Sequence, residues 1–499
     1  MLRRLAFNLA SSLALFSALN LAHAQLPAPV MQVLQLNGIA AQDLGVMVLR
    51  GDETVLAHGA TVAMQPASTI KVVTTLVGLE RLGPVFRGRT ELRSNGAIQD
   101  GVLRGDLVLK GGADADLSGA VLQDMLRALR YQGVRHIDGN LVLDRGLFLP
   151  ARQDVGVAPF DESPDAYYNV IPDALLVNKN LLQLDMRASA RSMTLQMHPL
   201  LERVGILSEM TLIDVDCARW EEGWKLPEVR RRGDGRIDLV LRGTFPKNCN
   251  RSYSVNVLDR DDYVERLVRQ AWQDLGGTIG GKGMVGTAPL ESRVLAAHAA
   301  RTLPEIVRDI NKLSDNTLAR TLFLSLGSLQ ADPLEGSMPL PTAQHGETTF
   351  ARADGAIRDW MRSQRIDDTG FVIENGSGLS RVERISAQQM AQVLQAGLRS
   401  QWAPEFQASL PIAALEGTMR RRLQGSPAAG RARLKTGSLR NVIAVAGYMP
   451  DANGNPCVVV AMVNSARAGD GRGRAVLDAL VDWVARSGAT AVPSALAAP

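Results

Sequence analysis

Ser68 and Lys71 lie three residues apart in the stretch Gln65-Pro66-Ala67-Ser68-Thr69-Ile70-Lys71, and such a pair could form a base-activated nucleophile. Pro66 is typical of a helix start, and the segment from there to Gly83 is apolar nearly all round, as in a helix buried in a domain core. Residues three apart share one helix face. A neutral lysine there could accept the serine proton, provided that burial and a second cation lower the pKa of the amine.

This pair alone does not establish catalysis, because a serine at a helix start followed by a surface lysine is an ordinary pattern. A second group of polar residues is Ser314-Asp315-Asn316, between the helical patterns 303–313 and 317–326. A junction between helices can project a hydroxyl and an amide into a cleft, although Ser314 could also be a simple helix cap. We interpret the similar stretch Ser254-Val255-Asn256, which lies in a predicted strand, as a chance match.

A third polar stretch, Lys435-Thr436-Gly437-Ser438, precedes two apolar segments, Val442 to Met449 and Cys457 to Val463. The two segments read as strands, so the lysine and the threonine should line a sheet edge. We expect Gly437 to remove a side chain where a substrate approaches the backbone closely. A helical pattern from 474 to 486 could pack on this sheet.

Composition bounds the class of protein. A chain of 499 residues exceeds one hydrophobic core and suggests two or three domains. Hydrophobic content of 46% and charged content of 21% are those of a soluble globular enzyme. The net charge of +4, which falls by two if Arg3 and Arg4 are removed with a leader, gives no argument for nucleic acid.

The sequence gives no reason to expect a cofactor or a metal. Gly276 to Gly286 is glycine-rich, but Gly283 stands where a phosphate loop needs a serine or threonine to hold magnesium. The six histidines form no metal-ligand spacing. We therefore read the glycine-rich stretch as a turn between strands.

Residues 1–24 have the pattern of an export signal. Arg3 and Arg4 precede an apolar run from Leu5 to Leu21, and Ala22-His23-Ala24 offers the small residues that a signal peptidase needs. A membrane anchor is the alternative, but the run is short, and no later stretch reaches the roughly 20 apolar residues of a spanning helix. We expect a mature chain that begins near Gln25 in the periplasm.

Export makes the three cysteines interpretable, because disulfides persist in the periplasm. We predict that Cys217 and Cys249 are bridged, which would restrain the unfolded chain by roughly 3 to 4 kcal/mol in the chain-entropy model. Cys457 lies in an apolar strand and is predicted to be a buried free thiol.

The order of elements indicates a divided catalytic domain. Ranges 25–88 and 293–490 should form it, and 491–499 should be a loose tail. Ranges 89–160 and 257–292 should form an inserted domain with a strand, helix, strand unit whose helix covers 120–131. Range 161–256 is rich in short strands and should be a nested subdomain.

Together, Ser68-Thr69-Ile70-Lys71, Ser314-Asp315-Asn316 and Lys435-Thr436-Gly437 resemble the three signatures of the penicillin-recognising serine enzymes. The long separation between the first two resembles the insertion of the D-alanyl-D-alanine carboxypeptidase/endopeptidase family of penicillin-binding protein 4 type. Three other stretches fit that family: 111–117, 375–381 and 416–422. The resemblance covers essentially the whole mature chain. It implies an α/β (α+β) fold of the transpeptidase/β-lactamase type, with an antiparallel sheet flanked by helices and a large α/β region inserted between the first two motifs.

The resemblance and the chemistry imply the same catalytic roles. Ser68 would attack the carbonyl between two D-alanines after Lys71 takes its proton, giving an acyl-enzyme. The backbone amides of Ser68 and Ser438 would hold the oxyanion. Ser314 would pass a proton to the leaving amine, and Asn316 would orient Lys71 and the substrate amide.

The same resemblance implies the substrate contacts. Lys435, with Thr436 and Ser438 and with Gly437 between them, would bind the terminal carboxylate and help to keep Lys71 neutral. The substrates would be peptidoglycan stem peptides that end in, or are crosslinked through, D-alanine. β-Lactams would bind covalently to the serine, and no metal or cofactor would be needed.

Two alternatives remain open. Tyr167-Tyr168-Asn169 has the tyrosine and asparagine spacing of one β-lactamase class, but it lies inside the insertion and runs into Val170-Ile171-Pro172. A wall-binding protein without activity is the other alternative, against which the intact motifs argue. The sequence also leaves open the preferred third stem residue, a homodimer, and the effect of Asn178 and Asn375, where family members often have aspartate.

Overall fold

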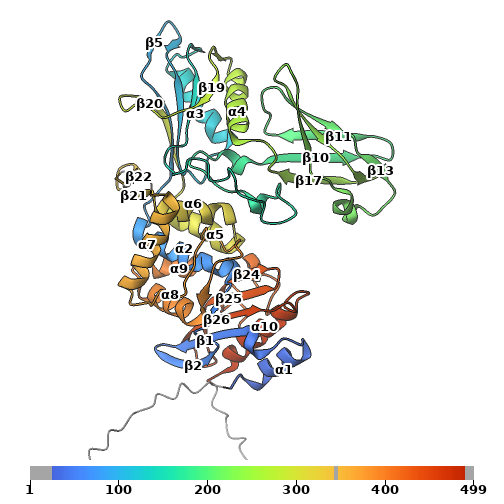
Figure 1. Ribbon diagram of the computed structural model, residues 1–499, viewed down its shortest axis with the longest axis vertical. Helices are drawn as coiled ribbons and strands as arrows, with labels where there is room; N and C mark the ends of the chain where they lie inside the picture. The colour runs from blue at the N-terminus through green and yellow to red at the C-terminus, as the bar shows by residue number, and fades with distance from the viewer. Residues whose placement is uncertain (1–24, 342–346, 489–499) are drawn as a thin grey trace, which may run out of the picture.

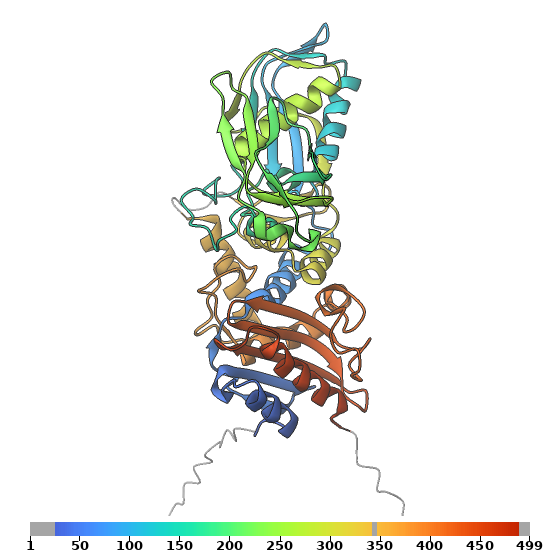
Figure 2. The same cartoon turned by 90° about the vertical axis from the view of Figure 1, so that its right-hand side faces the viewer.

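The computed structural model describes residues 25–341 and 347–488. The predicted signal peptide, 1–24, and the predicted tail, 491–499, lie outside the described residues. The molecule is elongated, with a body of sheet and helices at one end and the inserted region at the other (Figures 1 and 2). No helix among the described residues is long and apolar enough to cross a membrane.

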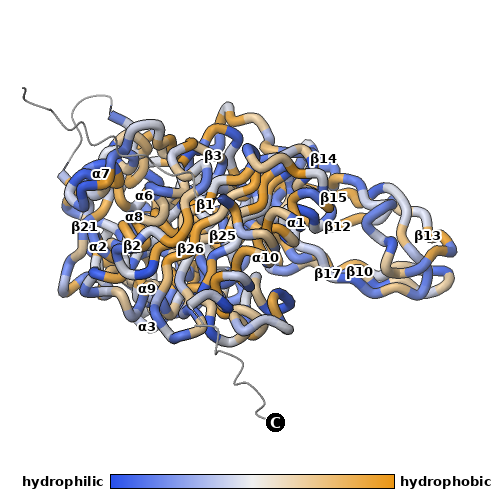
Figure 3. Tube along the Cα trace, turned by 90° about the horizontal axis from the view of Figure 1, so that it is seen from below, coloured by the Kyte–Doolittle hydropathy of each residue, from blue (hydrophilic) through white to orange (hydrophobic). Residues whose placement is uncertain are grey.

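A five-stranded antiparallel sheet forms the centre of the body, in the order β2-β1-β26-β25-β24. Its strands come from the two ends of the chain: β1 (Leu44–Arg50), β2 (Glu53–His58), β24 (Arg433–Leu439), β25 (Val442–Pro450) and β26 (Pro456–Asn464). Hydrophobic residues gather along β1, β25 and β26, as Figure 3 shows from below. β24 is an edge strand, so the Lys435 motif lies at a sheet edge as predicted.

Helices cover both faces of this sheet, which is why its inner strands are apolar without alternation. Along β26, Val458 and Val460 pack in one hydrophobic core, and Val459 and Ala461 pack in another. The second core contains α1 (Ala28–Leu36) and α10 (Arg472–Arg486). The first contains α2 (Lys71–Leu82), α5 (Leu303–Leu313), α6 (Asn316–Leu326), α7 (Thr349–Ser363), α8 (Ala387–Arg399) and α9 (Ala403–Ser409).

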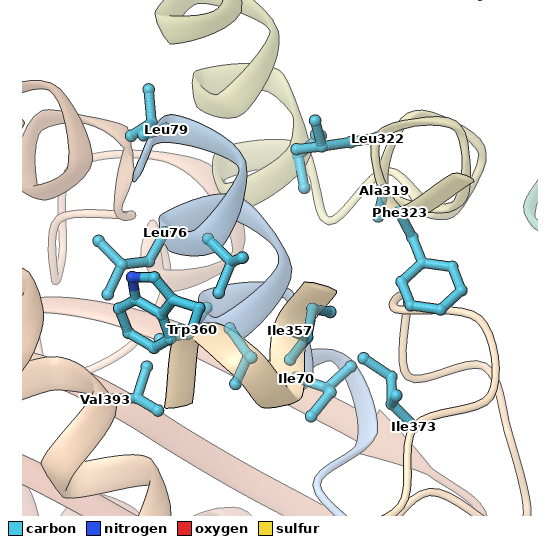
Figure 4. Close-up of a cluster of buried hydrophobic side chains, with 14 of the residues drawn as sticks. Ile70, Leu76, Leu79, Ala319, Leu322, Phe323, Ile357, Trp360, Ile373 and Val393 are labelled. Atoms are coloured by element: carbon cyan, nitrogen blue, oxygen red, sulfur yellow. The ribbon is translucent and has the colours of Figure 1, made fainter. Parts of the chain in front are cut away.

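Helix α2 is the element on which the other helices of this layer pack. Residues 71–79 are all buried, as the apolar pattern predicted. Leu76 and Leu79 of α2 belong to one cluster with Leu322 of α6 and Trp360 of α7 (Figure 4).

The start of this segment differs from the prediction of a continuous helix from Pro66. Residues Ala67–Ile70 form a 3-10 turn, and α2 begins at Lys71. Ala67 has a φ of 47°, a left-handed conformation that a regular helix does not contain. Ser68 therefore lies on a tight turn, and Lys71 opens the helix. Gly83, with a φ of 74°, ends it.

The inserted region contains a five-stranded sheet, β19-β9-β7-β4-β20, and a four-stranded sheet, β18-β8-β6-β5. β7 and β9 are parallel, with α3 between them in sequence, so the predicted strand, helix, strand unit is present. The bounds are β4 (Arg89–Ser94), β5 (Ala97–Gln99), β6 (Val102–Arg104), β7 (Leu107–Gly112), α3 (Gly119–Tyr131), β8 (His136–Ile137), β9 (Leu141–Asp144), α4 (Arg260–Asp274), β18 (Thr278–Ile279), β19 (Gly283–Val285) and β20 (Arg293–Ala299).

One predicted domain boundary is wrong. The catalytic range was expected to resume at 293, but β20 pairs with β4 in the inserted sheet. The strand is mostly apolar in sequence although only Leu295 is buried, so its local pattern does not tell to which sheet it belongs. The backbone of Ala300 donates to Gly88, which marks where the chain crosses between body and insertion. The remaining boundaries stay predictions.

Short strands fill the range predicted as a nested subdomain. They pair as β11-β10-β17, β12-β15-β14 and β13-β16, and a disulfide joins Cys217 to Cys249. Cys457 is buried and free. The bounds are β10 (Leu182–Ala188), β11 (Met193–His198), β12 (Val204–Ser208), β13 (Thr211–Ile213), β14 (Glu228–Arg231), β15 (Ile237–Leu241), β16 (Thr244–Pro246) and β17 (Asn250–Val255).

Two small pairs complete the body. β3 (Ala63–Met64) pairs with β23 (Ile385–Ser386), and β21 (Leu329–Asp332) pairs with β22 (Gly336–Pro339). Short 3-10 turns cover Ala41–Asp43, Ala67–Ile70, Tyr167–Asn169, Val177–Asn180, Cys217–Gly223 and Gly417–Met419.

Candidate active site

Ser68 and Lys71 meet where the 3-10 turn enters α2. The Lys71 Nζ lies 3.0 Å from the Ser68 Oγ and 2.7 Å from the Asn316 Oδ1. It also donates to the carbonyl of Ser377. The lysine is fully buried, so its amine is held by these three oxygens and not by solvent.

Lys435 comes from the edge strand β24 and is also fully buried. Its Nζ donates to the Ser314 Oγ at 2.9 Å and to the carbonyl of Thr436 at 2.7 Å. Ser314 has a left-handed backbone, with a φ of 60°, between α5 and α6. The structure thus brings the three sequence motifs into one site.

The electrostatics of the two lysines meet the conditions for a neutral base. Burial, followed by the nearby charge of Lys435, lowers the pKa of Lys71 well below its ordinary value, while Glu383 and Asp315 oppose the shift. Burial also lowers the pKa of Lys435, to about 7. Both effects favour the neutral form of Lys71 beside the serine that it would deprotonate.

Gly437 is needed for a reason that differs from the prediction. A Cβ at this position would lie 2.6 Å from the Pro66 carbonyl oxygen and 3.0 Å from the Ser68 nitrogen. The glycine therefore lets β24 approach the nucleophile turn of the same chain, and no substrate is needed to explain it. Gly378 packs against the same turn, where a Cβ would lie 2.0 Å from the Ala67 carbonyl oxygen.

A cleft of about 730 Å³ opens at these residues. The body contributes Ser68, Ser314, Asn316, Ser438 and Arg440 to its lining. Thr436 was also predicted to bind substrate, and its hydroxyl is hydrogen-bonded to the hydroxyl of Thr418 at 2.7 Å.

The inserted region also lines the cleft, through residues that include Tyr167, Tyr168 and Lys179. The Asn316 Nδ2 donates to the Tyr168 carbonyl at 3.1 Å, and Lys179 forms an ion pair with Asp315. Tyr167 to Asn169 thus contacts the second motif although it lies inside the insertion, which was the reason for giving its resemblance to a β-lactamase motif little weight. This segment of the insertion lies against the second motif, through the Tyr168 carbonyl.

Sequence reasoning gave no role to three groups beside the lysine base. The Ser377 carbonyl accepts from Lys71, Glu383 is buried near it, and Lys179 engages the second motif. The stretch that contains Ser377 had been singled out only because it resembled a family pattern. A backbone carbonyl has no sequence signal, and the two charged side chains lie far from the motifs along the chain.

Comparisons with known proteins agree with this geometry. Residues 27–487 match the D-Ala-D-Ala carboxypeptidase 3 (S13) family. The chain is 26% identical over 432 residues to the D-alanyl-D-alanine carboxypeptidase DacB of Haemophilus influenzae, which covers 84% of each chain. It is 26% identical over 413 residues to a D-alanyl-D-alanine carboxypeptidase of an Actinomadura species, covering 81% of this chain and 74% of the other.

A solved structure shows the same fold. Penicillin-binding protein 4 of Haemophilus influenzae superposes with a TM-score of 0.74 at 24% identity, covering 91% of this chain and 97% of the other. The family match spans nearly all of the described residues. The chain therefore belongs to the D-Ala-D-Ala carboxypeptidase 3 (S13) family, and it is a hydrolase of the serine carboxypeptidase type.

Proposed function

We propose that this enzyme removes the terminal D-alanine from peptidoglycan stem peptides and also cleaves crosslinks that run through D-alanine. The observation that supports it most strongly is the fully buried amine of Lys71, 3.0 Å from the Ser68 hydroxyl and faced by a second buried lysine. This is the arrangement of a nucleophile with its base.

In the first step, Lys71 accepts the Ser68 proton as Oγ attacks the carbonyl carbon between the two D-alanines. The backbone amides of Ser68 and Ser438 hold the oxyanion. Ser314, which accepts a hydrogen bond from Lys435, passes its hydroxyl proton to the leaving amine as the peptide bond breaks, and it recovers a proton from the Lys71 ammonium, which becomes neutral again. Water then attacks the acyl-enzyme and releases the shortened peptide.

The terminal carboxylate of the substrate binds at β24. Lys435 supplies the cation, while Thr436 and Ser438 supply hydroxyl groups next to it on the strand. Asn316 holds Lys71 through its Oδ1 and can turn toward the substrate amide. β-Lactams, which carry a carboxylate beside a strained amide, would acylate Ser68 through the same contacts.

The size and lining of the cleft favour an endopeptidase activity in addition to the carboxypeptidase activity. Its volume of about 730 Å³ is large for a dipeptide end alone, and both the body and the insertion contribute walls. A crosslinked, branched peptide could therefore enter. The Cys217–Cys249 disulfide supports a location in the periplasm, where such a bond persists.

Two experiments test this proposal. Fluorescent penicillin should label the wild-type protein and should not label Ser68→Ala, and full labelling of the variant would refute the assignment of the nucleophile. Incubation with whole peptidoglycan should release D-alanine and uncrosslinked peptides from the wild type alone.

The structure also bears on the β-lactamase alternative. The Tyr168 hydroxyl donates to Asp161 at 3.0 Å, and only the backbone carbonyl of this tyrosine meets Asn316. The hydroxyl therefore has a carboxylate partner, and no hydrogen bond joins it to Ser68 among the described residues. Rapid turnover of penicillin would support a β-lactamase, and peptidoglycan binding with no covalent labelling would support an inactive binding protein.

A further inference from the structure

The loop from 374 to 379 contacts both Lys71 and the helix that Lys71 opens. Its Ser377 carbonyl accepts from the Lys71 Nζ, and its Gly376 carbonyl accepts from the Thr74 Oγ1 of α2 at 2.7 Å. Gly376 and Gly378 have φ values of 69° and 84°, so the loop is a tight turn that glycine permits. The position of the lysine amine depends on the shape of this loop.

Glu383 fixes that shape from inside the body. It is 1% exposed, and its Oε1 accepts the backbone N–H groups of Glu374, Asn375 and Gly376 at 3.1, 3.0 and 3.1 Å. Its Oε2 is buried and has no hydrogen-bond partner among the described residues. A neutral amide oxygen could accept the same three bonds, so the loop alone does not require a carboxylate.

The charge of Glu383 acts within a group of buried ions. The charges that face Lys71 are Lys435 on β24, Arg320 on α6, Asp315 at the start of α6, and Glu383. Asp315 is already paired with Lys179 of the insertion. Glu383 forms no ion pair within 4.0 Å among the described residues. Burial raises the pKa of its carboxyl, but the three backbone N–H groups and the charge of Lys71 oppose this rise and favour the carboxylate that would offset the cations around the base.

We propose that Glu383 is the positioning residue of the lysine base: it shapes the loop that holds Lys71, and its charge stabilises the ammonium that forms when Lys71 takes the Ser68 proton. The charge matters most in the transition state, when Lys71 becomes a cation next to Lys435. This inference rests on the proposed function, since it assigns a role within the same acylation step.

Removing only the charge tests the inference. Glu383→Gln keeps an acceptor for the three N–H groups, and without the nearby carboxylate Lys71 should hold its proton less tightly. The acid limb of the pH profile of penicillin acylation should therefore move to lower pH. At high pH, where Lys71 is neutral in both proteins, we expect the rate to fall by about 10-fold to 100-fold because the new ammonium is less stabilised. This is no more than the low end of a whole general-base contribution, since the base itself remains.

Two matched variants distinguish the effect of the Glu383 charge from its effect on the shape of the loop. Glu374→Gln removes an exposed carboxylate of the same loop and should leave the acid limb in place. Asn375→Asp combined with Glu383→Gln returns a carboxylate to the loop, and it should move the limb back toward that of the wild type. This double variant also keeps the test valid if Glu383→Gln alone folds poorly, which thermal unfolding would show.

The outcomes are distinct from a failure of the proposed function. If wild type is acylated at Ser68 and Glu383→Gln lowers the rate without displacing the acid limb, the inference is overturned. It is also overturned if the double variant leaves the limb where Glu383→Gln has moved it. If wild type is not acylated at all, the proposed function itself fails.

Discussion

Two groups of buried cationic side chains, one in the inserted region and one in the body, have different kinds of partner. In the inserted region, the side chain of Arg145 is fully buried and pairs with the fully buried Asp173 at 2.7 Å and with Asp261 at 3.0 Å. In the body, Lys71 and Lys435 are just as buried, but their hydrogen bonds run to hydroxyl, amide and carbonyl oxygens.

This difference in partners distinguishes a buried cation that stabilises the fold from a buried lysine that can exchange a proton. A buried cation with a carboxylate partner stays charged and fixes the chain segments around it. A buried lysine without such a partner has a lowered pKa and can exchange a proton near neutral pH. The Arg145 cluster of the inserted region therefore helps to hold the fold, as does the body's own pair between Arg50 and the buried Asp451. Lys71 and Lys435 of the body lack such partners and are suited to proton exchange.

The largest expected effect is on catalysis when the buried base is removed. Lys71→Met should lower the rate of penicillin acylation by at least about 1000-fold, within the range of a lost general base. The free energy of unfolding should not fall, because a desolvated amine is replaced by an apolar chain. Stopped-flow acylation and urea unfolding measure the two effects. A variant that acylates within tenfold of wild type would show that Lys71 is not the base.

The inserted region should respond in the opposite sense. Arg145→Met leaves Asp173 and Asp261 without this partner, so we expect the free energy of unfolding to drop by about 3 to 5 kcal/mol. Acylation per folded molecule should stay within about threefold of wild type. Arg219→Met is the control, since it breaks an exposed pair with Glu222 and should cost under about 1 kcal/mol. Equal losses in the two variants would contradict the comparison.

The positions of the two buried lysines of the body could be predicted from the sequence. The apolar run after Lys71 predicted a buried helix, and burial of the lysine follows from its place in that run. The edge position of Lys435 followed from the two apolar strands after it. These predictions succeeded because local pattern and tertiary position agree there.

Other features of the site and fold could not be predicted, most of them because they depend on contacts between distant segments. Glu383 and Lys179 reach the site through loops whose charged residues look like solvated surface in the sequence. The edge strand β20 has a mostly apolar sequence, but it pairs with β4, which lies far earlier in the chain, and its local pattern does not reveal that partner. The 3-10 turn at Ser68 has the same composition as a helix start, and the left-handed Ala67 that distinguishes it has no sequence signal.

The second lysine of the body should produce an intermediate effect. Lys435→Ala should lower kcat/KM for a peptide ending in D-alanine by about 10-fold to 150-fold, the worth of a charge-assisted contact of about 1.5 to 3 kcal/mol. It should also remove most of the preference for the free acid over the amide. An unchanged acid-to-amide ratio would point to another cation, and Arg440, which lines the cleft, is the first candidate.

The pH dependence of the wild type reports the same lysine. Carboxylate binding needs charged Lys435, and its pKa is lowered to about 7 by burial, so kcat/KM for the free acid should decline as pH rises above about 7. Binding of the amide-ended peptide does not need this charge, so its profile should lack that decline. Parallel profiles for the two substrates would contradict the role of Lys435.

The smallest effect is expected where the two parts of the molecule meet. Lys179 of the inserted region pairs with Asp315, whose charge opposes the lowering of the pKa of Lys71. Lys179→Met leaves that carboxylate uncompensated, so Lys71 should hold its proton more tightly and the acid limb of acylation should move to higher pH, opposite to the shift expected for Glu383→Gln. Because the pair is partly exposed, we expect a change of less than about tenfold at neutral pH.

Lys179→Arg should restore the wild-type profile, and Lys247→Met, a change elsewhere in the insertion, should not alter it. If Lys179→Met leaves the acid limb in place, the inserted region tunes the base only through its shape, and the division between structural charge in the insertion and chemical charge in the body is sharper than the ion pair suggests.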